Sequence, residues 1–91
     1  MKIQELKAGM IVTSGVGTTI KGNYGRLHFY IQETYKDTTN VRAYSFLVHN
    51  GRIIQMYASM HTNFTHIIEE CHEVTGETKI KLQEQLMVIG I

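Results

Sequence analysis

Arginine, histidine and tyrosine side chains are the residues of this sequence best suited to recognition chemistry. Arg26, His28 and Tyr30 alternate along one segment, so on a strand they would share one face, because successive strand side chains point to opposite sides. Arg42 and Tyr44 would share a face of a following strand in the same way. Rings interleaved with cations on an open sheet can anchor a protein partner or stack single-stranded bases. The predicted binding residues are Arg26, His28, Tyr30, Arg42, Tyr44 and Tyr57.

The same side chains also have a purely structural interpretation. Tyrosines can cover a sheet while arginine stems lie over their rings and keep the charged ends in water. A net charge of +1 gives little support to nucleic-acid binding, since phosphate neutralisation supplies much of the affinity for nucleic acid. Among binding roles, a protein partner is therefore favoured over nucleic acid, and the structural interpretation stays open beside it.

Other groupings do not predict catalysis. The segment that starts at Gly15 reads Gly-Val-Gly-Thr-Thr-Ile and lacks the third glycine of the dinucleotide fingerprint, because Ile20 occupies that position. A phosphate-binding loop would need lysine where Asn23 stands. Cys71 and His72 are adjacent in the sequence, so on a helix their side chains would project about 100° apart rather than toward each other. We therefore expect a protein that is not an enzyme.

A metal or another cofactor is not expected either. Zinc donors do gather in one part of the sequence, but they lack the Cys-x-x-Cys pair typical of structural zinc sites. The simpler interpretation is a buried structural cysteine beside surface histidines. The donors concerned are His61, His66, Cys71 and His72.

Length and composition predict one small domain over residues 1–91, with 43% hydrophobic residues and a single cysteine. With one cysteine, no intrachain disulfide can hold the fold, so packing must. The sequence shows no signal-peptide core and no membrane-length apolar run, so we expect a cytoplasmic protein with no membrane partner. Residues 1–61 carry seven basic and three acidic groups, or +4, and residues 62–91 carry two and five, or −3. Opposed charge of this kind favours association between copies.

The strand pattern that must position these side chains is clearest around Asn50-Gly51. Asn-Gly between β-rich runs predicts a type I′ hairpin, since both residues tolerate positive φ. A two-residue loop places His49 opposite Arg52 and Tyr44 opposite Tyr57. Neither face of this hairpin is polar, so we expect it to lie between two layers or beneath a partner. The glycines of residues 15–25 predict a loop, with a brief second strand at Thr18-Thr19-Ile20 as an alternative for part of it.

Residues 62–74 are ambiguous in the sequence. Phe64, Ile67, Ile68 and Cys71 follow the spacing of one helical face, which favours a helix, although residues 74–77 could instead turn a hairpin. The tail alternates and predicts a closing strand. The expected fold is α+β and mainly β: a small five- to six-stranded antiparallel sheet or partly open barrel with one short helix at 62–74.

We therefore expect a non-catalytic interaction domain that binds another protein through an aromatic and basic sheet face, and that forms a homo-oligomer. One alternative is a small nucleic-acid-binding β-barrel for single-stranded DNA or RNA. A second is a small-molecule pocket beneath the glycine-rich segment, since methionine adapts to irregular pockets. That pocket would be lined by Met10, Leu27, Met56 and Met60.

Overall fold

The computed structural model describes every residue of the chain except 2, 36–39 and 65–67. Its described part is mainly β, a six-stranded antiparallel open sheet with one α-helix, which confirms the predicted fold class. The strands are β1 (Ile11–Ile20), β2 (Asn23–Thr34), β3 (Asn40–His49), β4 (Arg52–Met56), β5 (Met60–Asn63) and β6 (His72–Glu73). The helices are α1 (Gly76–Ile89) and two short 3-10 turns, η1 (Ile3–Glu5) and η2 (Ile68–Glu70).

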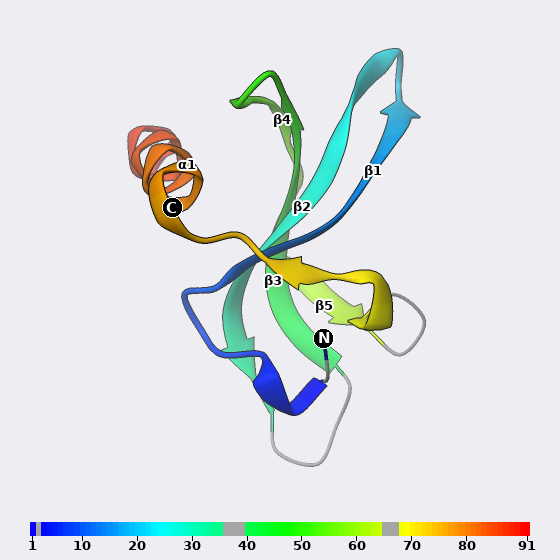
Figure 1. Cartoon of the computed structure of the whole chain (residues 1–91), viewed down its shortest axis with the longest axis vertical. Helices are drawn as coiled ribbons and strands as arrows, with labels where there is room; N and C mark the ends of the chain where they lie inside the picture. The colour runs from blue at the N-terminus through cyan, green and yellow to red at the C-terminus, as the bar shows by residue number, and fades with distance from the viewer. Residues whose placement is uncertain (2, 36–39, 65–67) are drawn as a thin grey trace.

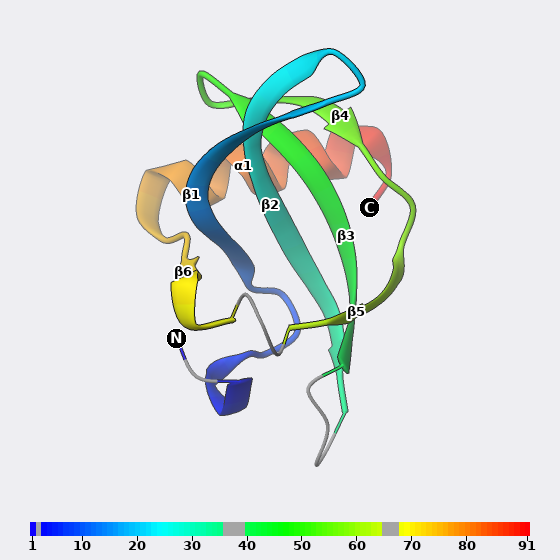
Figure 2. The same cartoon turned by 90° about the vertical axis from the view of Figure 1, so that its right-hand side faces the viewer.

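The sheet has the strand order β4-β3-β2-β1-β6, and β5 also pairs with β3 (Figure 1). Strands β4 and β5 pair with opposite ends of β3. The long central strands curve, and α1 lies across one face of the sheet (Figure 2). Among the described residues, no helix has the length and apolar character needed to cross a membrane.

The Asn50-Gly51 turn is confirmed. Asn50 and Gly51 have φ angles of 51° and 78°, as a type I′ turn requires, and His49 pairs with Arg52. A register shift between Leu47 and Val48 then displaces the rest of the hairpin. The predicted pairing of Tyr44 with Tyr57 is wrong for this reason, since the Tyr57 backbone N–H donates to the Ser45 carbonyl at 2.9 Å.

The glycine-rich segment is not the predicted loop. It forms the far half of β1 and the start of β2, joined by a tight turn in which Lys21 and Gly22 have φ angles of 51° and 84°. A β-bulge separates Thr13 from Gly17 in β1. Gly25 is required where β2 crosses close to β3, because a Cβ there would lie 2.9 Å from the Val48 carbonyl oxygen.

The position of the helix was predicted wrongly. Residues 62–74 contain the end of β5, η2 and β6, while residues 65–67 lie outside the described part of the chain. The α-helix is Gly76–Ile89, where alternation predicted a strand. Leu82 and Leu86 explain this error: a spacing of four satisfies both a period of two and a helical turn. The helix follows an extended Thr75 at its N-cap and ends at Gly90, whose φ of 104° is left-handed.

The sheet is the middle layer of the molecule, with a hydrophobic core on each face. This arrangement explains why neither face of the β3–β4 hairpin is polar. The first-face core contains the buried residues Leu6, Val12, Phe29, Ile31, Val41, Ala43, Phe64 and Cys71. The second-face core lies beneath α1 and contains the buried residues Ile11, Phe46, Val74, Leu82 and Leu86.

Candidate functional site

Five of the six predicted binding residues share the sheet face that α1 covers. His28 pairs with Phe46 and Tyr30 pairs with Tyr44, and cross-strand partners present their side chains on the same face. Arg26 lies on the same face because it is two residues from His28 in β2, and Arg42 does so because it is two residues from Tyr44 in β3. Tyr57 is separate, because it follows β4, and its hydroxyl is buried without a hydrogen-bond partner among the described residues.

Helix α1 divides this face into two open regions. Leu82 and Leu86 pack against Ile11 and Phe46 in the middle of the sheet. Beside the N-terminal half of the helix lies a pocket that contains Arg26 and His28. At the opposite end of the sheet, the side chains on this face are half-buried or exposed. We call that second region the aromatic surface, defined as Tyr30, Tyr35, Arg42, Tyr44 and His61.

The aromatic surface is organised by contacts between β3, β5 and the end of β2. Arg42 and His61 are cross-strand partners, and the Arg42 guanidinium donates to His61 Nε2 at 3.2 Å. The Tyr35 ring stacks on His61 with 5.5 Å between centroids, and its hydroxyl donates to the Glu33 carboxylate at 3.1 Å. Arg42 and His61 are exposed. The surface therefore presents a cation and rings held in place by neighbours.

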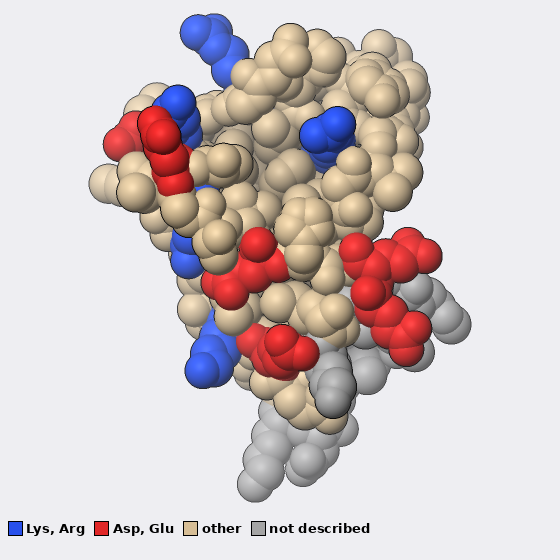
Figure 3. Space-filling view, in the orientation of Figure 1, with Lys and Arg blue, Asp and Glu red and all other residues tan. Residues whose placement is uncertain are grey.

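The pocket has a volume of about 580 Å³, within the range of small-molecule sites. Figure 3 shows a hollow framed by the helix and the two hairpins, with a basic side chain on its wall. Five parts of the chain form it: β1, β2, the β3–β4 turn, β6 and the start of α1. The polar side chains that line it are Thr13, Tyr24, Arg26, His28, His49, Asn50, His72, Glu73, Thr75 and Thr78.

The β1–β2 hairpin is held over the pocket by contacts with the neighbouring hairpin. The Tyr24 and His49 rings meet edge to face with 6.3 Å between centroids. Asn23 Nδ2 donates to Gln55 Oε1 at 2.7 Å. These contacts join two segments that are far apart in the sequence, so they fix the width of the pocket mouth.

Thr13 and His28 are the buried polar residues of the described pocket lining, and His28, which is 5% exposed, is the titratable one. Its ring stacks on Phe46, and its Nδ1 lies 2.9 Å from the Arg26 carbonyl oxygen. Because a carbonyl oxygen only accepts, Nδ1 carries the proton and Nε2 is left for the pocket. Burial lowers the pKa of His28, the hydrogen bond to the Arg26 carbonyl offsets part of this effect, and the nearby charges of His72 and Arg26 lower the pKa further. The neutral imidazole is therefore the favoured form.

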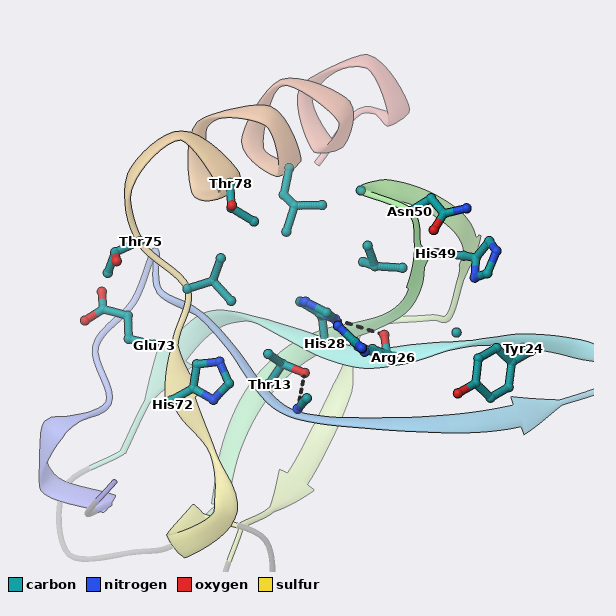
Figure 4. Close-up of a pocket in the computed structure, with 16 residues that line it drawn as sticks. Thr13, Tyr24, Arg26, His28, His49, Asn50, His72, Glu73, Thr75 and Thr78 are labelled. Atoms are coloured by element: carbon teal, nitrogen blue, oxygen red, sulfur yellow. Dashed lines mark hydrogen bonds between the residues drawn. The ribbon is translucent and has the colours of Figure 1, made fainter.

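The remaining polar groups have distinct orientations. Thr13 supports the β-bulge, since its hydroxyl donates to the Leu27 carbonyl at 2.7 Å and accepts the Gly15 N–H at 3.1 Å. His72 and Thr78 point toward the pocket, whereas Glu73 points away from it (Figure 4). The pocket interior is consequently richer in cationic and neutral donors than in carboxylates.

The methionine-lined pocket expected from the sequence does not form. Met10 and Leu27 pack against the first-face core and Met56 against the second-face core, so the sheet separates them. Met60 is 58% exposed. The sequence missed the real pocket because its walls meet only once the helix is placed at 76–89. The turn at Asn50-Gly51 and the strand that carries Arg26 and His28 were the two parts of its wall that the sequence marked.

The possible zinc donors are also dispersed. His61 contacts Arg42, Cys71 is buried in the first-face core, and His72 lines the pocket, while His66 lies outside the described residues. Burial raises the pKa of the Cys71 thiol, which disfavours the thiolate that a metal would need. Within the described part of the chain, no three such donors are grouped for a metal ion.

Comparison of the chain with protein-family models, with curated proteins and with solved structures found no match. A functional assignment must therefore come from the two open regions themselves. Both lie on the face that carries the predicted binding residues.

Proposed function

We propose that this protein is a non-catalytic interaction domain that binds another protein through the aromatic surface. The observation that carries the proposal is the exposed Arg42 side chain, held by His61, beside half-buried tyrosines on a sheet face that α1 leaves open. Tyrosine and arginine are the side chains most enriched among the strongly contributing residues of protein interfaces.

Pre-positioned side chains favour this use of the surface. Ordering a long side chain on binding costs roughly 0.5–1.5 kcal/mol, and Arg42 already has a partner that restricts it. His61 is restricted in turn by the stacked Tyr35 ring. A partner that docks here consequently loses less of its binding free energy to ordering the surface.

The charges around Arg42 favour a protein over nucleic acid. Glu33 is the cross-strand partner of Arg42, so a carboxylate lies close to the cation and would repel a phosphate backbone. Arg26 belongs to the pocket at the other end of the sheet and does not extend a basic track along the face. Mixed charge with tyrosine rings suits a protein partner, including a second copy of this chain.

A panned library of random peptides displayed on phage tests the proposal without a known partner. We expect enriched peptides to bind the wild-type protein in fluorescence anisotropy and to lose about ten-fold or more in affinity for Tyr44→Ala and Arg42→Ala. Arg52→Ala is the matched control, since Arg52 is an exposed arginine at the β3–β4 turn, outside the aromatic surface. Peptides that bind all variants equally would refute the assignment of the surface.

Light scattering after size-exclusion chromatography tests self-association as one form of the proposal. A dimer that Tyr44→Ala dissociates and Arg52→Ala preserves would identify the partner as a second copy. A labelled single-stranded oligonucleotide that binds in an Arg42-dependent way would instead favour the nucleic-acid alternative.

A further inference from the structure

We propose that the pocket between α1 and the two hairpins binds a small organic anion, with a phosphate or carboxylate group placed between Arg26, His72 and the first turn of α1. This site lies at the opposite end of the sheet from the aromatic surface. A result that refutes one proposal therefore does not count against the other.

Charge in the pocket is the first reason. Arg26, His28 and His72 come from two strands and line one cavity, and the structure gives Arg26 no ion pair among the described residues. Glu73 is the one acidic side chain of the described lining, and it points away from the cavity (Figure 4). Arginine donors without a carboxylate are suited to bidentate binding of a phosphate or carboxylate.

The start of α1 supplies further donors for an anion. Thr75 caps the helix without a side-chain hydrogen bond, so the backbone N–H groups of the first turn have no partner from that side chain. Thr78 points into the pocket from the same turn (Figure 4). Free N–H groups and the positive end of the helix dipole both favour negative charge at this position.

The rest of the cavity indicates an organic ligand rather than a bare ion. A volume of about 580 Å³ is far larger than one phosphate group needs. Val48, Val74 and Leu82 give it an apolar wall, and the Tyr24 and His49 rings stand at its mouth. A ligand with an apolar or aromatic body attached to the anionic group would bury both parts.

Proton uptake should accompany binding because of the position of His28. Its neutral ring faces Arg26 on β2, His72 on β6, Thr13 on β1 and Phe46 on β3, and the two charged or titratable neighbours both disfavour its protonated form. A bound anion offsets that repulsion and raises the pKa of His28. Binding should therefore be tighter at lower pH, within the range where the protein stays folded.

Isothermal titration with phenyl phosphate and with benzoate tests the site, and neutral benzamide controls for the aromatic body. We expect at least one anion to bind, benzamide to bind at least ten-fold more weakly, and Arg26→Gln to weaken the anion about ten-fold or more. The two anions distinguish a phosphate site from a carboxylate site. Arg52→Gln removes the same charge outside the pocket and should leave affinity unchanged.

Backbone amide shifts in nuclear magnetic resonance spectra locate the bound anion. Shifts confined to the pocket lining and to the first turn of α1 support the site. Three results would each overturn it: no binding of either anion at millimolar concentration, benzamide binding as tightly as the better-bound anion, or equal losses in Arg26→Gln and Arg52→Gln. His28→Phe should keep the stacking on Phe46 and lower the proton uptake on benzoate binding, and uptake equal to that of the wild type would contradict the role of His28.

Discussion

The two faces of the sheet are closed in different ways. The first-face core is closed by Leu6, which precedes β1, and by Phe64 and Cys71, which lie between β5 and β6, and its members are apolar. The second face is covered mainly by α1, which crosses the strands so that part of their length extends beyond it (Figure 2). The first face consequently has packing as its role, while the second keeps a pocket and an aromatic surface open. Incomplete coverage is what leaves polar side chains available for binding.

The largest expected effect is a loss of stability when a side chain of the first-face core is truncated. Phe64 is fully buried and packs edge to face on Phe29 with 5.0 Å between centroids. Phe64→Ala should lower the free energy of unfolding by roughly 3–5 kcal/mol, because it removes a large apolar side chain and leaves a cavity. Urea denaturation measures the change, with Phe64→Leu as a volume-conserving control that loses much less. A loss below about 1 kcal/mol for Phe64→Ala would show that this face is not the better-packed one.

A smaller loss is expected on the helix side. Leu82 is buried, but it also lines the pocket, so the site can relax after truncation. Leu82→Ala should cost an amount near the lower end of roughly 2–5 kcal/mol. Ile80→Ala on the exposed side of the same helix is the control and should change stability very little, since Ile80 is 55% exposed. Equal losses in the two variants would mean that α1 does not cover the sheet as described.

Gln85 attaches α1 to the edge of the sheet and gives the third prediction. Its Oε1 accepts the Ile53 N–H at 2.8 Å and its Nε2 donates to the Gly51 carbonyl at 2.9 Å, so it satisfies backbone groups of β4 and its turn. Gln85→Ala should cost about 1–2 kcal/mol by leaving a part-buried N–H unpaired. Gln83→Ala is the same change on the same helix, and a comparable loss there would remove any special role for Gln85.

The smallest expected effect is the pH dependence that His28 gives to the second face. Its pKa is lowered in the folded state, so between that value and the unfolded value of about 6.5 the unfolded chain binds more protons. The contribution of His28 to the free energy of unfolding is fully present above about pH 6.5, and it is lost as the pH falls toward the pKa of the folded state. Urea midpoints for wild type and His28→Phe should therefore converge or cross in acid, and a difference that is constant with pH would contradict the buried neutral form.

Local chemistry explains which parts of the fold could be predicted. Asn50 and Gly51 define their turn because few other residues accept positive φ at both positions. Alternation from Arg26 to Gln32 identified β2, because a sheet with unlike faces imposes a period of two. Alternation grouped Tyr30 with His28 and Tyr44 with Arg42, and the register between β2 and β3 then places Tyr30 and Tyr44 on the same face.

The position of the helix could not be predicted from the same kind of pattern. Phe64 and Cys71 are seven residues apart, which fits a helical face, yet both enter the first-face core without forming one. Leu82 and Leu86 fit either period, so only the available space on the second face assigns them to a helix. A one-residue shift at Leu47 likewise displaced Tyr57, and bulges of this kind depend on the packing of neighbouring strands.

The sequence by itself determined the mainly β class, the β3–β4 turn and which side chains alternate together within a strand, because these depend on backbone preferences and on a period of two. Only the tertiary structure decided which of those side chains are buried and which stay exposed. The tertiary fold placed α1 over His28 and Phe46, which made one predicted binding residue a buried pocket wall. It left Arg42 exposed beside Tyr44 at the other end. Burial depends on which distant segment covers a face, and that is settled by the packing of the whole chain.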